Sequence, residues 1–248
     1  MEKTTNISDI KKAAVIINGF PDFIGINPLT NLLIESNIIV FQPHMAGTFD
    51  SDYNFSPEGA YNTFLALNSF INDSIGSKFP NGELEKMPWK IENIVLAGHS
   101  FGGFFALRYF NLIKNINKII FTSAVLHYHP KYGCLENGPE QYNKVFNQYP
   151  FTYRLSSIDL WNGMWEGKDP LPIKQLGKVN NIMVIYGEND KYFNKKLVND
   201  NFLEVITSYI NSDDIKMVIV DRAGHPLADL LDNRELCQQI KNFIFTER

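Results

Sequence analysis

The apolar positions of the chain fall into short runs in which β-branched residues are common. Six of these runs stand out, at residues 13–17, 38–41, 94–97, 119–122, 182–186 and 215–220. They are nearly continuous and lack the alternation of apolar and polar residues that is typical of a strand with one solvent-exposed face. Such runs are typical of strands that are buried on both faces, as in a parallel sheet.

Longer stretches with a helical spacing of apolar residues lie between several of the runs. They cover residues 57–75, 101–113, 195–210 and 227–245, and the first begins with a Ser-Pro-Glu start signal. Alternating strands and helices predict an α/β fold, with a mostly parallel sheet of about six core strands flanked by helices. The ligand site of such a sheet lies beyond the carboxyl ends of its strands, so the functional residues should come directly after the apolar runs in the sequence.

One long segment breaks this alternation. Residues 125–181 are rich in Tyr, Trp, Asn, Gly and Pro and contain no clear buried strand. Connections of that length usually have a function or a small structure of their own. We interpret residues 1–248 as a single domain in which residues 125–181 form an inserted cap subdomain. Because the cap starts at the carboxyl edge of the sheet, we expect it to cover the site.

The composition is that of a globular protein, with 44% hydrophobic and 20% charged residues among 248. A formal net charge of -4 without any Lys/Arg block argues against a nucleic-acid partner. No apolar stretch approaches the length that spans a bilayer, and the polar first twelve residues do not resemble a signal peptide. Cys134 and Cys237 are the two cysteines, so we expect no metal site and a cytoplasmic location with reduced thiols, although the two cysteines could still pair.

The strongest motif is Gly-His-Ser-Phe-Gly-Gly at 98–103, between the run at 94–97 and the helical stretch at 101–113. It places Ser100 on a strand-to-helix turn, where a nucleophilic serine needs small residues two positions away, here Gly98 and Gly102. The helix N-terminus would also stabilise the oxyanion of an acyl transfer. A plain βα turn or a phosphate-binding turn can have the same glycines, so the interpretation depends on further residues.

A serine nucleophile needs a base, and the base needs a carboxylate that fixes its tautomer. Asp190 closes Gly-Glu-Asn-Asp after the run at 182–186, and His225 lies in Ala-Gly-His-Pro after the run at 215–220. Each residue therefore follows a predicted strand, as Ser100 does. We predict Ser100 as the nucleophile, His225 as the general base and Asp190 as the acid.

Further residues compete for the roles of acid and base. They are Glu188, Asp221, His44, His99, His127 and His129. Glu188 comes early in its loop, and Asp221 lies at a strand end. His99 adjoins Ser100, but adjacent side chains on such a turn point in different directions, which favours a packed neighbour. The two histidines of the inserted segment would reach Ser100 only if that segment folds onto it.

The loop after the first predicted strand reads Asn18-Gly19-Phe20-Pro21, where an oxyanion loop belongs. The expected oxyanion donors are the backbone N–H groups of Phe20 and Phe101. Together, this loop, Gly-His-Ser-Phe-Gly-Gly, Gly-x-x-Asp and Gly-His resemble the α/β-hydrolase superfamily over nearly the whole chain. The resemblance implies a serine hydrolase without a cofactor and is unspecific for the substrate. Two features depart from the family pattern: Asn18 replaces the usual loop histidine, and no N-terminal hairpin precedes residue 13.

The inserted segment is dense in aromatic residues, namely Tyr128, Tyr132, Tyr142, Phe146, Tyr149, Phe151, Tyr153, Trp161 and Trp165. They either wall an apolar pocket beside Ser100 or form a small core of the segment itself. The candidate substrate-binding residues are His44, His99, Tyr128, Trp161 and Trp165.

The expected activity is hydrolysis of a carboxylic ester or thioester of a small-molecule acyl substrate through a Ser100 acyl-enzyme. An aminopeptidase is an alternative, because three glutamates of the inserted segment, Glu136, Glu140 and Glu166, could bind a substrate amine. An acyl-transferring or cyclising enzyme and a non-catalytic binding protein stay open as well.

Overall fold

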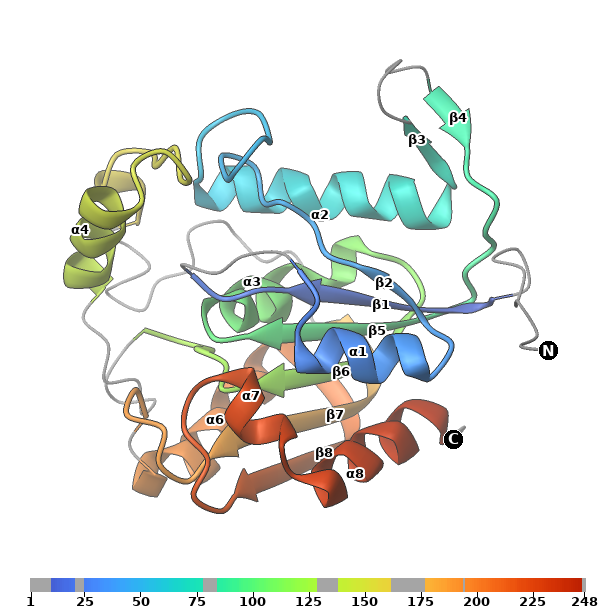
Figure 1. Cartoon of the computed structure of the whole chain (residues 1–248), viewed down its shortest axis with the longest axis vertical. Coiled ribbons are helices and arrows are strands. Elements are labelled where there is room, and N and C mark those ends of the chain that lie inside the picture. Colours follow the sequence, from blue (N-terminus) through green and yellow to red (C-terminus); the bar gives the residue numbers. More distant parts are fainter. Residues whose placement is uncertain are drawn as a thin grey trace.

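A six-stranded, fully parallel sheet forms the centre of the molecule (Figure 1). The computed structural model describes residues 10–20, 25–77, 84–128, 138–161, 177–193 and 195–246. The strands are β1 (Lys12–Ile17), β2 (Ile39–Phe41), β5 (Asn93–His99), β6 (Ile116–Thr122), β7 (Gly177–Gly187) and β8 (Ile210–Val220), in the order β2-β1-β5-β6-β7-β8. Each overlaps one of the six apolar runs, so the predicted α/β sheet is confirmed.

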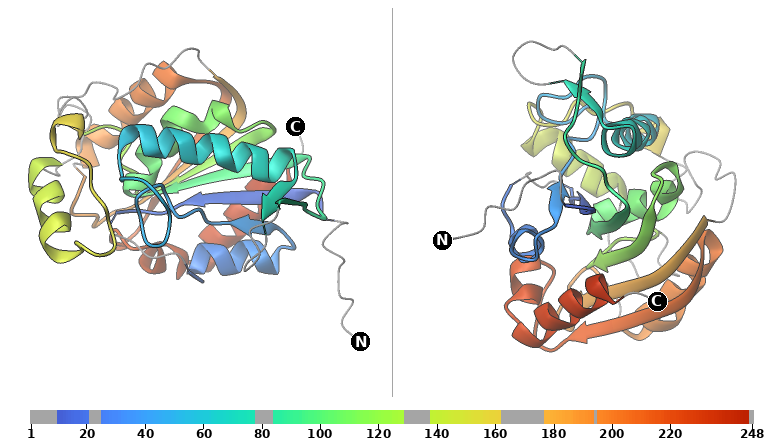
Figure 2. Two further views of the ribbon diagram at one scale, coloured as in Figure 1. Left: turned by 90° about the horizontal axis from the view of Figure 1, so that it is seen from above. Right: turned by 90° about the vertical axis from the view of Figure 1, so that its right-hand side faces the viewer.

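Helices cover both faces of the sheet (Figure 2). One face packs against α2 (Pro57–Asn72), α3 (Phe101–Tyr109) and α6 (Lys195–Tyr209), and the other against α1 (Pro28–Glu35), α7 (Leu227–Leu231) and α8 (Arg234–Phe245). Neighbouring strand residues divide between the two cores. Val15 and Leu96 belong to the first core, whereas Ile16 and Val95 belong to the second. Both faces of the strands are therefore buried, which explains why their apolar runs are continuous.

The helical boundaries differ from the sequence prediction in several places. The apolar pattern does not predict α1, which begins after Asn27, whose Oδ1 accepts a hydrogen bond from the Thr30 backbone N–H at 2.9 Å. The stretch 227–245 is two helices, because Asn233 lies between them and caps α8 by accepting from Leu236 N at 3.0 Å. The stretch 101–113 is α3 followed by the short 3-10 helix η2 (Phe110–Leu112).

A small antiparallel hairpin follows α2. Its strands are β3 (Ile75–Ser77) and β4 (Leu84–Lys86), and it projects from the body of the molecule in Figure 1. The helical stretch predicted to end at residue 75 is shorter, since α2 ends at Asn72. No helix among the described residues is long and apolar enough to cross a membrane.

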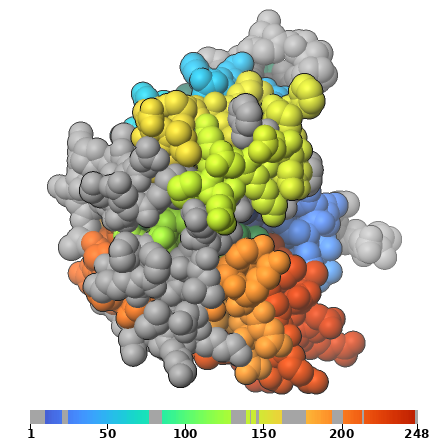
Figure 3. Space-filling model, turned by 90° about the vertical axis from the view of Figure 1, so that its left-hand side faces the viewer, coloured from blue at the N-terminus to red at the C-terminus, as the bar shows by residue number. Residues whose placement is uncertain are grey.

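The inserted segment contains α4 (Gly138–Gln148) and ends earlier than its composition suggests. Strand β7 begins at Gly177, so residues 177–181 belong to the sheet and pair with β8. The segment docks on the loop after β2 through Thr48↔Tyr153 and Phe55↔Leu155 bridges. Figure 3, which views the left-hand side of Figure 1, shows α4 and residues 149–161 at the surface there.

Candidate active site

Ser100 lies on a sharp turn between β5 and α3, as the motif predicts. Its φ of 50° and ψ of -126° are unusual for a residue that carries a side chain, and such strain is common at functional positions. Backbone hydrogen bonds hold the turn. Ser100 N donates to Thr122 O at 3.1 Å, and Ser100 O accepts from Gly103 N at 3.0 Å and from Val125 N at 2.8 Å.

Two of the three glycines of the motif, Gly98 and Gly102, are required by close backbone contacts. A Cβ atom at Gly98 would lie 2.7 Å from Gly103 Cα, and one at Gly102 would lie 2.1 Å from Ile17 O. Neither position tolerates a side chain without a shift of the backbone. The sequence-based reason for these glycines, avoidance of a clash with neighbouring backbone, therefore holds.

A continuous chain of hydrogen bonds links Ser100, His225 and Asp190. The Ser100 Oγ to His225 Nε2 distance is 2.9 Å, and the His225 Nδ1 to Asp190 Oδ2 distance is 2.8 Å. The Asp190 side chain is 1% exposed and that of His225 is 17% exposed. The second Asp190 oxygen, Oδ1, accepts from Tyr192 N at 3.0 Å. This arrangement holds Nδ1–H toward the carboxylate and leaves Nε2 to accept the serine proton.

The loops that carry Asp190 and His225 are tied to each other by backbone hydrogen bonds. Glu188 N donates to Val220 O at 2.9 Å, and Asn189 N donates to Ala223 O at 2.8 Å. A Cβ atom at Gly187 would lie 2.3 Å from Ala223 O. Close packing of these two loops fixes the distance between the carboxylate and the imidazole.

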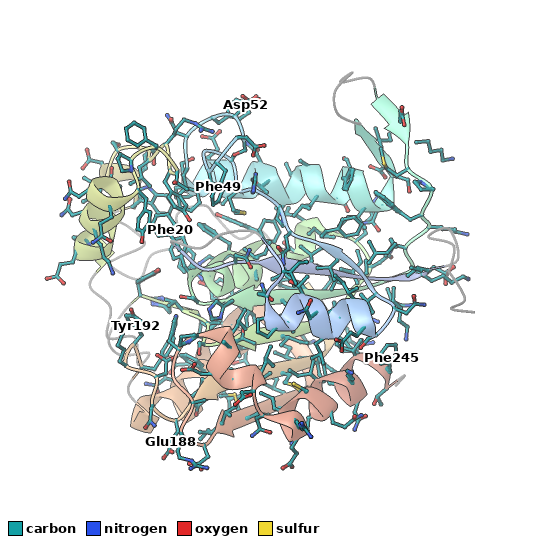
Figure 4. All side chains as sticks on the ribbon, in the orientation of Figure 1. Phe20, Phe49, Asp52, Glu188, Tyr192 and Phe245 are labelled. Carbon is teal, nitrogen blue, oxygen red and sulfur yellow. The ribbon has the colours of Figure 1, made fainter. Side chains whose placement is uncertain are left out.

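Two aromatic rings that the sequence pattern does not single out contact His225. The Tyr192 ring lies edge-on at 4.6 Å between centroids, and the Phe193 ring is stacked at 6.2 Å. Figure 4 shows Tyr192 on the loop after β7. Both residues follow Asp190 closely in the sequence, but an aromatic pair in a loop is too common a pattern to indicate this contact.

His99 is buried beside this hydrogen-bonded chain. Its Nδ1 donates to Thr122 O at 2.9 Å, and its ring centroid lies 5.4 Å from that of His225. Burial, followed by the nearby charge of His225, lowers the pKa of His99 from 6.5 to about 4. His99 is therefore neutral at physiological pH. Although predicted as a substrate-binding residue, His99 lines neither of the two cavities that adjoin Phe20 and Phe101.

The loop after β1 passes directly against Ser100. A Cβ atom at Gly19 would lie 2.9 Å from Ser100 Cβ and 3.5 Å from Ser100 Oγ. Phe20 follows in this loop, with its ring 5.3 Å from that of Phe101. Phe101 is the first residue of α3, where backbone N–H groups have no partner within the helix. The rings of the two residues predicted as oxyanion donors therefore pack together, one on the loop that abuts Ser100 and the other on the residue that follows Ser100.

Two small cavities share Phe20, Phe55 and Phe101 in their linings. The first, which we call the loop cavity, has a volume of about 30 Å³ and is also lined by Ile17, Asn18, Gly19, Pro43, His44, Met45, Thr48, Phe49, Phe105 and Tyr153. The second, the aromatic cavity, has a volume of about 10 Å³ and is also lined by Tyr128, Tyr142, Leu155 and Trp161.

Four aromatic residues of the inserted segment line a cavity and pack in or against the core, namely Tyr128, Tyr142, Tyr153 and Trp161. Phe151 is instead 96% exposed, so the expectation that it walls a pocket or joins a core is wrong. Trp161 and Tyr128 are buried in the same hydrophobic cluster as Phe101. The Trp161 Nε1–H donates to Ser156 Oγ at 2.9 Å, and Tyr142 OH donates to Ser156 O at 2.7 Å. A pocket wall and a small core are therefore made by the same side chains. Several of the named residues lie outside the described ranges: His129, Tyr132, Cys134, Glu136, Trp165 and Glu166.

The competing acids and bases lie in different environments. His44 contacts the Asp50 carboxylate through Nδ1, and its ring stacks on Phe49 at 4.7 Å. Glu188 accepts a hydrogen bond from Arg222 N at 3.3 Å, and Asp221 is an exposed partner of the Arg222 guanidinium. His127 is buried at the start of the inserted segment. The part of the chain that the structure describes contains no group of three or more His, Cys, Asp or Glu residues that could hold a metal ion.

Comparison with solved structures identifies the fold. A Paleococcus ferrophilus monoacylglycerol lipase matches with a TM-score of 0.58 and 15% identity over 96% of each chain. A thermophilic esterase from Thermogutta terrifontis matches with a TM-score of 0.57 and 16% identity, covering 96% of this chain and 92% of the other. The alpha/beta hydrolase domain-containing protein 10 from mouse matches with a TM-score of 0.55 and 14% identity, covering 94% and 89%.

These likenesses show that the chain has the α/β-hydrolase fold, as its motifs imply. At the level of sequence, no protein-family model matches the chain, and no curated protein does.

Proposed function

We propose that this protein is a serine hydrolase that cleaves a carboxylic ester or thioester through a Ser100 acyl-enzyme. The hydrogen-bonded chain from Ser100 through His225 to the buried Asp190 carries the proposal. Each group has the chemistry that its role needs: a strained, presented hydroxyl, an imidazole and a carboxylate. Esterases and a lipase among the solved structures of the same fold give further support.

In the first half-reaction, Ser100 Oγ attacks the carbonyl carbon while its proton passes to His225 Nε2. Asp190 remains ionised and stabilises the imidazolium through Nδ1–H. The carbonyl oxygen becomes an oxyanion, which accepts hydrogen bonds from the backbone N–H groups of Phe20 and Phe101. The intermediate then collapses: the bond to the leaving group breaks, and the leaving alcohol or thiol takes the proton from His225.

In the second half-reaction, water replaces the leaving group. His225 takes a proton from the water as its oxygen attacks the acyl carbon, and the new oxyanion occupies the same donors. Collapse breaks the bond to Ser100 Oγ, which recovers its proton from His225. The products are a carboxylic acid and the free enzyme, so no cofactor enters the balance.

His99 contributes to this chemistry by staying neutral. A second imidazolium 5.4 Å from the His225 ring would oppose the protonation of His225 that the transition state requires. Because burial holds the pKa of His99 at about 4, this repulsion is absent at neutral pH.

The test is covalent labelling by a fluorophosphonate probe, followed by mapping of the modified peptide. The proposal predicts one adduct, on Ser100, and loss of that adduct in Ser100→Ala. A panel of p-nitrophenyl esters, a thioester, aminoacyl amides and an added alcohol acceptor then separates an esterase from a thioesterase, an aminopeptidase and an acyl transferase. Absence of labelling together with absence of turnover on every substrate would instead favour a non-catalytic binding protein.

A further inference from the structure

Polar residues take the place of apolar ones near the amino ends of four neighbouring strands. Lys12 begins β1, Asn93 begins β5, Lys118 lies in β6 and Asn181 lies in β7. Side chains two positions apart lie on the same face of a strand. Two positions further along each strand stands a member of the core that α8 covers, namely Ala14, Val95, Ile120 or Met183. The four polar side chains therefore face the same side of the sheet as α8.

A cavity lies at this level, where α8 ends. Its volume is about 370 Å³, which is within the range of small-molecule sites and far above that of either cavity beside Phe101. Figure 4 shows Phe245, at the end of α8, on the opposite side of the molecule from Tyr192, which contacts His225. We call it the amino-end cavity, and its lining consists of Lys12, Asn93, Val95, Asn117, Lys118, Asn180, Asn181, Ile244 and Thr246.

Asn181 carries a buried amide whose hydrogen-bonding groups are unused. The residue is 8% exposed, and its side chain makes no hydrogen bond within the described ranges. The Asn18 amide is sealed from solvent, whereas the polar atoms of Asn181 keep accessible surface in the lining of the amino-end cavity. Buried amides are normally paired, so this one indicates a water or a ligand group that enters from the cavity.

Asn93 supplies a second donor to the same lining. Its Oδ1 accepts a hydrogen bond from Asn117 Nδ2 at 2.9 Å, so the Asn93 side chain is oriented by its neighbour. Its Nδ2 has no partner in the part of the chain that the structure describes. The cavity thus offers two amide N–H₂ groups from adjacent parts of the sheet.

The charged groups around the cavity are positive. Lys118 is buried, and its Nζ donates to three carbonyl oxygens at the end of α8, among them Ile244 O at 3.2 Å and Thr246 O at 2.6 Å. These bonds offset the partial negative charge of the helix C-terminus. Lys12 Nζ lies 4.9 Å from the Phe245 ring centroid and has no carboxylate partner among the described residues. No Asp or Glu of the described ranges lines the cavity.

We propose that the amino-end cavity is a second ligand site, which binds a small organic or inorganic anion with carboxylate or phosphate oxygens. One anionic oxygen accepts from Lys12 Nζ, and others accept from Asn181 Nδ2 and Asn93 Nδ2. Such charge-assisted hydrogen bonds are stronger than those between neutral groups, and a cation would find no carboxylate there. The inference concerns binding alone and does not depend on the proposed function of Ser100.

The test is calorimetry at constant ionic strength with succinate, inorganic phosphate and the neutral analogue succinamide. At least one anion should bind with one site per chain, about tenfold or more tightly than succinamide, and the stronger of the two anions identifies the ligand class. Lys12→Met should weaken that binding about tenfold. The matched control is Lys11→Met, which removes the same charge from the adjacent residue, because Lys11 pairs with Glu92 outside the cavity. The control should bind as the unmodified protein does.

Asn181→Leu tests the amide, since it keeps the approximate size and removes both polar atoms. It should also weaken anion binding about tenfold, whereas Asn211→Leu, at an exposed position of β8 outside the cavity, should not. Thermal melting checks that the variants fold, and if Asn181→Leu does not fold, the two lysine variants decide. Absence of anion binding, equal affinity for succinamide, or binding that Lys12→Met leaves unchanged would overturn the inference.

Discussion

Gly19 and Ser100 are in such close contact that a Cβ atom at Gly19 would lie 2.9 Å from Ser100 Cβ. Gly19→Ala must therefore displace either the nucleophile or the loop that presents the Phe20 N–H. A displacement of about 1 Å in such a site costs on the order of 100-fold in rate. We expect kcat/KM for an ester to fall by about that factor while the melting temperature changes little. Gly25→Ala is the control, because a Cβ atom there meets nothing within 4 Å among the described residues. Full activity of Gly19→Ala would show that this contact does not position the nucleophile.

His99 should make the stability of the protein depend on pH. Its pKa is about 4 in the folded protein and 6.5 ordinarily, so protonation favours the unfolded chain. The contribution of His99 to the free energy of unfolding is complete above pH 6.5, is lost as the pH falls toward 4, and is then constant. The loss amounts to at most about 3 kcal/mol.

Denaturant unfolding at several pH values measures this effect. His99→Asn keeps a donor near Thr122 O and removes the titration, so its stability should fall less between pH 6.5 and 4 than that of the unmodified protein. Parallel curves for the two proteins would show that His99 does not titrate in this way.

Asp190 rather than Glu188 should be the acid partner of His225. In Asp190→Asn the new amide can donate to Nδ1, which favours the tautomer that protonates Nε2 and blocks transfer of the Ser100 proton. We expect a loss of about 10⁴-fold in kcat. Glu188→Gln should cost less than about tenfold, since the Glu188 carboxylate accepts from the Arg222 backbone N–H and a glutamine oxygen can do the same. The reverse order of effects in steady-state kinetics would assign the acid to Glu188.

Trp161 should limit the length of the acyl group. It is buried, with its ring 5.2 Å from Phe55 and 6.1 Å from Phe101, and the aromatic cavity beside it is only about 10 Å³. Trp161→Phe enlarges this space, so the ratio of kcat/KM for a hexanoyl over an acetyl ester should rise about tenfold. The control is Trp89→Phe, because Trp89 packs on Phe41 and lies outside both cavities. An equal change in kcat/KM for all acyl lengths would show that the aromatic cavity is not part of the acyl-binding site.

The sheet could be predicted well from the sequence because its strands are buried on both faces, which leaves a continuous apolar signal. Helix α1 could not, since its start depends on the Asn27 cap and Pro28 over only eight residues. The proximity of Ser100, Asp190 and His225 could also be predicted, because each residue follows the carboxyl end of a parallel strand, β5, β7 or β8.

Other features of the site depend on contacts between distant segments and have no local signal. The Tyr192 ring against His225 is one example. The unpaired amide of Asn18 is another, because only the packing around it reveals that no described residue satisfies it. The dual role of Trp161, in the core and beside a cavity, likewise needed three-dimensional placement.

Ester turnover by Ser100→Ala, measured beside Ser123→Ala, decides whether Ser100 is the nucleophile. Both changes remove one hydroxyl, and Ser123 follows β6 with a buried Oγ that has no hydrogen-bond partner in the described part of the chain. Circular dichroism and thermal melting check that both variants fold. We expect kcat to fall by about 10⁴- to 10⁶-fold in Ser100→Ala and by less than about threefold in Ser123→Ala. Retention of full activity by folded Ser100→Ala protein would contradict the assignment of Ser100 as the nucleophile.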